Sequence, residues 1–216
     1  PVKDFAPITL IGYIPFALVA GNELPENSLQ ELVASVKANP GKRRILTSVV
    51  EHSAVLNHCL ALEKEGYRVT RLPVDRDGLL KLADLDAAIT DDVAVVSLMW
   101  ANNETGVLFP VKEIAEICRA RGVLYHCDAV QAAGRVPIDI RQVSADYLSL
   151  TGHKFHAPKG VGVLYVRRKA PYSPYIHGGH QERNLRGGTE SVPLIVGMGK
   201  AAELARRHPP DYEKKV

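Results

Sequence analysis

The strongest constraint on the fold is an alternation of short apolar runs with amphipathic segments between residues 45 and 166. The apolar runs are continuous, as is typical of strands that helices cover on both faces. Segments of helical periodicity separate these runs, and a strand–helix–strand repeat predicts an α/β fold with a mostly parallel sheet. The predicted strands are 45–50, 67–72, 93–99, 123–127, 147–150 and 162–166, and the predicted helices are 54–65, 82–89 and 111–121.

The segment before this repeat has a different character. Residues 5–21 are almost wholly apolar, but two prolines and a glycine interrupt them, and the four residues before them are neutral overall. This pattern favours a buried strand or a poorly formed leader over a membrane span or a signal peptide. Ser28 and Glu31 then have the spacing of a capping box, which predicts a helix. We therefore divide the chain into an atypical N-terminal segment (1–43), a large domain (44–206) and a polar tail (207–216).

Composition narrows the class of protein. With 46% hydrophobic and 24% charged residues, the chain is typical of an ordinary globular protein. Its net charge of +3 comes from dispersed basic residues, so we expect no nucleic-acid partner, and we expect no membrane association. Cys59, Cys118 and Cys127 lack CxxC spacing, which predicts neither a disulfide framework nor a zinc site and favours a cytoplasmic location.

Polar and titratable residues follow four of the predicted strands. Ligands of parallel sheets bind beyond the carboxyl ends of the strands, so these segments are the candidates for chemistry. They are 51–52, 100–106, 128–131 and 151–156.

Three of these strand ends carry residues suited to a pyridine cofactor. Lys154 lies on a turn where a partly buried amine is a nucleophile, although most loop lysines are merely solvated. Asp128 could pair with a ring nitrogen, with Gln131 donating to a ring oxygen, and aspartate is also a common helix cap. His52 is flat and titratable, which suits ring stacking and proton transfer as well as helix capping.

Taken together, five segments resemble the NifS/IscS-type cysteine desulfurases of the class V aminotransferase group. They are EHSAVL, SLMWANNETGVLFPV, YHCDAVQAAGRVPID, SLTGHKFHAPKGVGVLYVRR and GGHQERNLRGGTES. WANNETG and GHKFHAPKGVGVLY bring the likeness nearer to the NifS branch, and it extends from residue 44 to about residue 206. The resemblance implies the large domain of a fold-type I pyridoxal-phosphate transferase.

The resemblance also implies pyridoxal 5'-phosphate as cofactor and a role for each strand end. Lys154 would hold the cofactor as a Schiff base and move the α-proton of the substrate. Asp128 would pair with the pyridinium nitrogen, and His52 would stack on the ring. Gln131 and Asn103 would contact the ring oxygen and the substrate side.

Three further residues would hold the cofactor phosphate. Thr151 and His153 would bind it, with Thr151 standing where the family usually has serine. Thr189, in the RxGT-like segment, would reach the phosphate of the other subunit, which implies a homodimer.

The implied reaction converts L-cysteine to L-alanine and passes persulfide sulfur to a scaffold protein for iron–sulfur or nitrogenase cofactor assembly. Two parts of the family pattern are missing from this sequence: the threonine- and serine-rich phosphate turn, and the small C-terminal domain with its sulfur-accepting cysteine. We therefore expect a truncated desulfurase in which none of the three cysteines replaces that nucleophile.

Other readings stay open. A selenocysteine lyase or a small-amino-acid aminotransferase would use the same core, and an inactive remnant would keep only cofactor or partner binding. Metal binding is less favoured, because no carboxylate or cysteine stands at a fitting spacing from the candidate histidines. Those histidines are His153, His156, His177 and His180.

Overall fold

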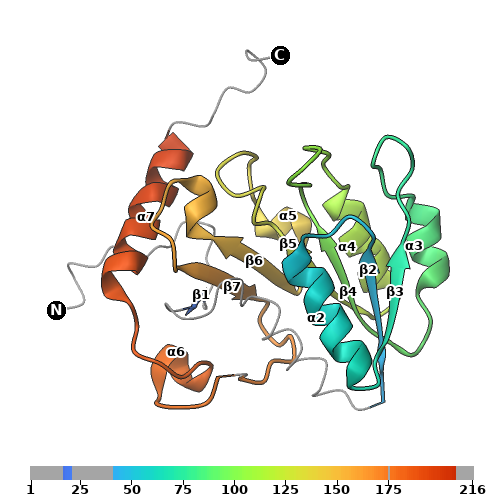
Figure 1. Ribbon diagram of the computed structural model, residues 1–216, viewed down its shortest axis with the longest axis horizontal. Coiled ribbons are helices and arrows are strands. Elements are labelled where there is room, and N and C mark those ends of the chain that lie inside the picture. The colour runs from blue at the N-terminus through green and yellow to red at the C-terminus, as the bar shows by residue number, and fades with distance from the viewer. Residues whose placement is uncertain (1–16, 21–40, 175, 208–216) are drawn as a thin grey trace.

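A seven-stranded sheet organises the protein (Figure 1). The computed structural model describes residues 17–20, 41–174 and 176–207, with the backbone alone for 17–20. The strand order is β1-β7-β6-β5-β4-β2-β3. The strands are β1 (Ala17–Ala20), β2 (Arg44–Ser48), β3 (Arg68–Leu72), β4 (Val93–Met99), β5 (Leu124–Asp128), β6 (Tyr147–Thr151) and β7 (Gly162–Val166).

The predicted α/β fold with a mostly parallel sheet is confirmed. Strands β6, β5, β4, β2 and β3 run parallel to one another. β7 is antiparallel to β6, because the connection 152–161 is too short for the crossover that a parallel pair requires. β1 pairs antiparallel with β7, so a strand within the apolar segment 5–21 is confirmed for 17–20. The rest of that segment and the predicted helix at Ser28 lie outside the described residues.

Helices cover both faces of the sheet. Three of them were predicted and begin and end within one residue of the expected bounds: α2 (Ser53–Lys64), α3 (Leu82–Ala88) and α4 (Val111–Ala120). Four further elements were not predicted: α5 (Ile140–Val143), the 3-10 turn η2 (Gly152–Phe155), α6 (Gln181–Asn184) and α7 (Val192–Arg207). One core cluster packs α2 against the sheet, and the other packs α3, α4 and α7 against the opposite face.

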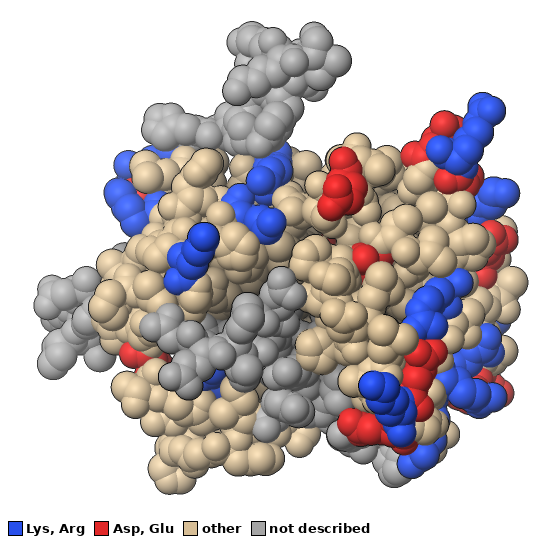
Figure 2. Space-filling view, in the orientation of Figure 1, with Lys and Arg blue, Asp and Glu red and all other residues tan. Residues whose placement is uncertain are grey.

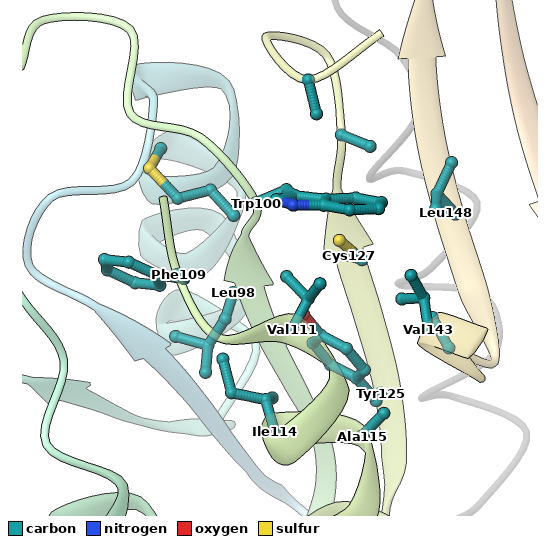
Figure 3. Close-up of a cluster of buried hydrophobic side chains, with 14 of the residues drawn as sticks. Leu98, Trp100, Phe109, Val111, Ile114, Ala115, Tyr125, Cys127, Val143 and Leu148 are labelled. Atoms are coloured by element: carbon teal, nitrogen blue, oxygen red, sulfur yellow. The ribbon is translucent and has the colours of Figure 1, made fainter. Parts of the chain in front are cut away.

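The centre of the core is β4, in which every residue is buried. On the α4 side, Leu98 packs with Ile114 and with Tyr125 of β5 (Figure 3). Burying a leucine or isoleucine side chain contributes about 1.5–3 kcal/mol. Cys127 lies in the same cluster, and the two other cysteines are also buried and free. The cysteines of the sheet and helices are therefore packing residues of the core.

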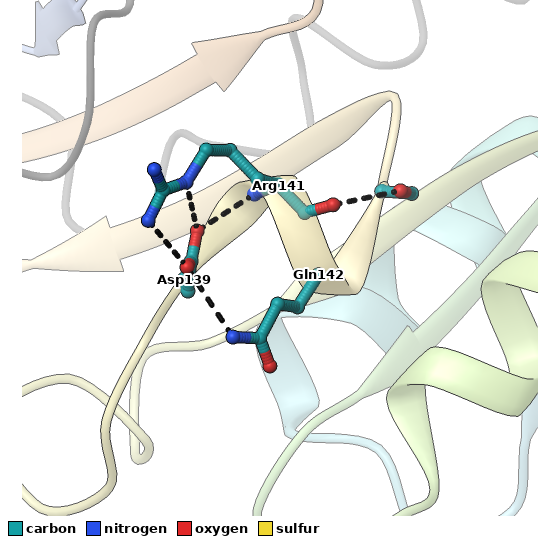
Figure 4. A network of polar contacts seen from close by, with 4 residues as sticks. Asp139, Arg141 and Gln142 are labelled. Atoms are coloured by element: carbon teal, nitrogen blue, oxygen red, sulfur yellow. Dashed lines mark hydrogen bonds and ion pairs between the residues drawn. The ribbon is translucent and has the colours of Figure 1, made fainter.

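A carboxylate orders the chain between β5 and β6. Asp139 Oδ1 accepts from the backbone N–H of Arg141 at 3.0 Å and so caps α5 (Figure 4). The same carboxylate binds the Arg141 guanidinium at 2.7 Å and the Gln142 amide at 3.4 Å. These bonds, first among them those to Arg141, lower the pKa of Asp139 to about 2. The cap therefore stays ionised and holds the approach to β6 through the whole neutral range.

Charges of both signs are mixed at the surface. In Figure 2, Lys and Arg stand among Asp and Glu toward the edge of the molecule that carries α3 and β3. Two of the pairs are Arg121–Asp86 at 2.8 Å and Arg71–Glu63 at 2.9 Å. In the described part of the chain, no helix has the length and apolar character needed to cross a membrane.

One buried histidine joins three strands. His126 of β5 is fully buried, with Ser97 Oγ of β4 at 2.9 Å from Nδ1 and Ser149 Oγ of β6 at 2.7 Å from Nε2. Burial lowers the pKa of His126 from 6.5 to about 3, so the ring is neutral in the folded protein. Through these contacts His126 links β4 and β6, the two strands that flank β5, and β5 is the strand that ends at Asp128.

We predict that His126 makes the free energy of unfolding decrease as the pH falls below 6.5. The unfolded ring binds a proton below pH 6.5 and the folded ring does not, so its contribution is fully present above pH 6.5 and is lost as the pH falls toward 3. Relative to His126→Asn, the wild type should lose about 1.4 kcal/mol of unfolding free energy per pH unit below 6.5. Urea unfolding at pH 7, 6 and 5 measures this, with His58→Asn on α2 as control. Parallel curves for wild type and His126→Asn would contradict it.

Candidate active site

The carboxyl ends of β2, β4, β5 and β6 lie along one edge of the sheet, because these strands are parallel. Backbone hydrogen bonds continue just past the strands. Trp100 N–H donates to the carbonyl of Asp128 at 2.8 Å, and Ala129 N–H donates to the carbonyl of Ser149 at 3.0 Å. The four predicted segments therefore meet at one edge, which is where ligands of such sheets bind.

Asp128 is the last residue of β5 and is 8% exposed. Its Oδ1 accepts from the backbone N–H of Val130 at 2.9 Å, so it caps the turn that follows. No hydrogen bond from a described residue reaches Oδ2. Burial raises the pKa of Asp128, while the Val130 N–H and the His52 ring act in the opposite direction. A cationic group in front of Oδ2 would hold this carboxylate in its charged form.

His52 is the N-cap of α2, in the short connection that follows β2. Its Nδ1 accepts from the N–H of Ala54 at 3.2 Å, so the interpretation of His52 as a helix cap is confirmed. This bond leaves Nε2 as the nitrogen that carries a hydrogen. The ring is half-buried and interacts electrostatically with Asp128. Capping thus orients the imidazole beside the buried carboxylate, and stacking on a cofactor stays a prediction.

Lys154 lies on η2, immediately beyond β6. Gly152 begins this turn, and a Cβ there would lie 2.9 Å from Val161 Cγ1 and 3.0 Å from Ala157 Cβ, closer than atoms can pack. Phe155 is buried and anchors the other end of the turn. Lys154 itself is half-buried, and no hydrogen bond or ion pair with a described residue engages its amine. The turn therefore places at the carboxyl edge of the sheet an amine that no described residue binds.

The remaining predicted residues differ in exposure. Thr151 ends β6 half-buried, and its Oγ1 lies 3.1 Å from Nδ1 of the exposed His153. Gln131 is half-buried in the turn after Asp128. Thr189 lies exposed between α6 and α7, and no hydrogen bond among the described residues joins it to the strand ends. The structure thus gathers the first three at the edge and leaves Thr189 apart.

The segment after β4 contains a residue that sequence reasoning missed. Asn103 is exposed, and its amide donates to Glu104 Oε1 at 2.8 Å. Asn102 is buried, with its amide donating to the carbonyl of Val50 and its Oδ1 accepting from the N–H groups of Glu104 and Thr105, each at 2.9 Å. Asn102 therefore joins the loops after β2 and β4. An asparagine followed by a turn glycine is typical of this arrangement, and the role of Asn103 stays a prediction.

We predict that Asn102→Ala lowers the free energy of unfolding by about 2–4 kcal/mol, because it removes a buried side chain that makes three hydrogen bonds between and within the two loops. Asn103→Ala is the matched control and should change it by less than about 0.5 kcal/mol, as expected for an exposed side chain. Urea unfolding at pH 7 measures both. Equal effects of the two substitutions would contradict this account of the loop.

The candidate histidines do not assemble a metal site in the described part of the chain, where no group of three His, Cys, Asp or Glu side chains could hold an ion. His153, His156, His177 and His180 are all exposed.

The sheet and the helices that cover it have the architecture of the fold-type I large domain, which NifS-like proteins share. The model of the aminotransferase class-V family matches residues 27–211, and the chain belongs to that family.

Curated relatives carry desulfurase names. The chain is 50% identical over 190 residues to cysteine desulfurase 2 of Trichormus variabilis, covering 88% of this chain and 48% of that protein. It is 53% identical over 180 residues to cysteine desulfurase NifS of Azotobacter vinelandii, covering 83% and 45%. The chain thus spans about half the length of these relatives.

Solved structures agree with this assignment. A NifS-like protein superposes with a TM-score of 0.84 at 39% identity, covering 89% of this chain and 53% of that one. SspA, solved in complex with cysteine, superposes with a TM-score of 0.79 at 37% identity, covering 87% and 55%.

Proposed function

We propose that this chain is the cofactor-binding part of a pyridoxal-phosphate-dependent cysteine desulfurase, which converts L-cysteine to L-alanine and persulfide sulfur. The observation that carries the proposal is the placement of Asp128 and Lys154 on neighbouring strand ends. Asp128 is a buried carboxylate at the end of β5, and Lys154 lies on the turn after β6. β5 and β6 are paired neighbours in the sheet. Two observations support L-cysteine as the substrate. The relatives that are 50% and 53% identical to this chain are named cysteine desulfurases, and SspA was solved in complex with cysteine.

The residues present fit pyridoxal 5'-phosphate. The ring nitrogen needs a carboxylate, and Asp128 keeps Oδ2 available while the turn holds Oδ1. The aldehyde needs a primary amine, and Lys154 offers one that no described residue engages. His52 adds a flat ring beside the carboxylate. When bound, the cofactor supplies an electron-withdrawing ring that stores the charge left on the substrate when its α-proton departs.

Lys154 has two tasks in this proposal. Its amine would hold the cofactor aldehyde, and its Nζ would take up the α-proton of the substrate. His52 carries its hydrogen on Nε2 because Nδ1 accepts from the N–H of Ala54 at the start of α2. Asp128 would hold the ring nitrogen in its protonated form. We propose that Gln131 and Asn103 orient the ring oxygen and the substrate, and that Thr151 and His153 hold the phosphate.

The sulfur-accepting step requires a thiolate, and the cysteines of this chain are unsuited to that role. Burial raises the pKa of Cys59 to about 11 and that of Cys118 to about 12, and it raises the pKa of Cys127 further. All three are core residues. We therefore propose that the acceptor cysteine belongs to the half of the relatives' length that this sequence does not span.

The wider setting follows from the same proposal. A desulfurase of this kind acts in the cytoplasm and delivers sulfur to a scaffold protein for iron–sulfur or nitrogenase cofactor assembly. Thr189, exposed between α6 and α7, would contact the phosphate of a second subunit in a homodimer. A selenocysteine lyase or an aminotransferase shares the core chemistry, but no relative cited above carries either name.

We predict that Lys154→Ala abolishes the visible absorbance that appears when the wild type is titrated with pyridoxal phosphate, because the amine that binds the aldehyde is gone. Lys159→Ala, an exposed lysine beyond the same turn, is the control and should titrate like the wild type. Absorbance spectra at pH 8 with matched circular dichroism measure this. A wild type without the band, or a Lys154→Ala variant that keeps it, would refute the site.

We predict that Cys127→Ala, which removes the thiol next to Asp128, leaves alanine formation from L-cysteine within about threefold of wild type, because a buried neutral thiol does not accept sulfur. The assay measures alanine released by the protein carrying the second half that its relatives possess, with cofactor and a reductant present. Loss of alanine in Cys127→Ala, with cofactor absorbance retained, would assign the acceptor to Cys127 instead.

A further inference from the structure

Glu51 is a buried acid at the site that the roles above do not use. It follows β2, precedes His52 and is 5% exposed. Its Oε1 accepts from the Ser48 hydroxyl at 2.7 Å and from the backbone N–H of Met99, the last residue of β4, at 3.0 Å. One carboxyl oxygen therefore joins the ends of β2 and β4.

The second oxygen of this group has no partner. Glu51 Oε2 is buried and makes no hydrogen bond, although a charged carboxylate in such surroundings would need several donors. A proton on Oε2 removes the charge, and with it the larger part of the cost of burial, while Oε1 keeps both accepted bonds. Burial, reinforced by the charge of Asp128, raises the pKa of Glu51 to about 8, against the opposing effects of the Ser48 hydroxyl and the Met99 amide.

The cysteine and tyrosine side chains that face Glu51 are neutral, so the negative charge at this edge of the sheet lies on Asp128. Cys59 on α2 and Tyr125 and Cys127 on β5 interact with Glu51, and burial raises the pKa of each, which keeps them neutral. Asp128 interacts with both Glu51 and His52. Two buried carboxyl groups that share an environment separate into one neutral and one charged member.

We propose that Glu51 is a positioning residue: as a neutral carboxylic acid it clamps the end of β2 to the end of β4, sets the start of α2 where His52 stands, and leaves Asp128 as the charged carboxylate. The proposal rests on the function proposed above, because the site it positions is the cofactor site. Without the clamp, His52 and Asp128 lose their fixed relation, and cofactor affinity falls. An amide at position 51 keeps the accepting oxygen and so preserves the clamp.

The first test needs no cofactor. The infrared spectrum of the protein at pH 6 should contain the carbonyl band of a buried protonated acid, absent from Glu51→Gln and lost from the wild type above pH 8. Glu51 keeps its proton up to about pH 8 in the folded protein but loses it near pH 4.5 in the unfolded chain. The stability that protonated Glu51 contributes at low pH is therefore lost progressively as the pH rises from 4.5 to about 8. The unfolding constant of the wild type should rise relative to that of Glu51→Gln by about tenfold per pH unit over that range.

The second test measures the dissociation constant of pyridoxal phosphate at pH 7. Glu51→Ala should weaken binding at least tenfold, and Glu51→Gln should recover most of that loss. The control is Glu63→Gln, which changes a glutamate of α2 that pairs with Arg71 of β3, and it should bind the cofactor as the wild type does. If Glu51→Ala does not fold, Glu51→Asp replaces it, because its shorter side chain cannot reach both donors.

The outcomes separate the two proposals. A wild type that binds no cofactor overturns the proposed function, and the infrared band and pH-linked stability then still decide the state of Glu51. A wild type that binds cofactor but lacks the acid band at pH 6 overturns the neutral clamp. Equal cofactor affinity in wild type and Glu51→Ala overturns the positioning role.

Discussion

The backbone pairing of β4 with its two parallel neighbours is the constraint on which the rest of this structure depends. Every side chain of Val93–Met99 is buried, so helices must cover both faces of the sheet at its centre. β2 and β5 pair with β4 in parallel, and their carboxyl ends therefore lie at the same edge. Residues that follow three different strands become neighbours through main-chain hydrogen bonds alone.

Side chains then refine this edge. Asn102 joins the loop after β4 to the carbonyl of Val50, and Glu51 joins the end of β2 to the amide of Met99. His126 links the serines of β4 and β6 through β5. Each of these hydrogen bonds can form in only one register of the strands, so the buried polar groups select that register, which apolar packing alone would leave open. The candidate catalytic residues occupy the rim of this framework.

The distribution of charge follows from burial. Asp128 and Glu51 are both buried acids near one another, and burial raises the pKa of each. The three cysteines lie in the two core clusters, where burial keeps their thiols neutral. The edge is thus suited to holding a cationic ring and to moving a proton, whereas sulfur acceptance requires an exposed thiolate. In the proposed function, the cofactor-binding residues lie in this chain, and the sulfur-accepting cysteine belongs to the half of the relatives' length that this sequence does not span.

The sequence by itself determined the six strands and three long helices between 44 and 166, the mostly parallel character of the sheet and the family, because periodicity and strand-end motifs are local properties of the chain. It also placed Asp128, His52 and Lys154 at strand ends. Only the tertiary structure decided that β7 runs antiparallel and that Asn102 rather than Asn103 joins two loops. It alone decided that Glu51 is buried with one oxygen unpartnered. Those features depend on contacts between residues far apart in the chain, and burial, which sets the charge of an acid, exists only after the sheet has assembled.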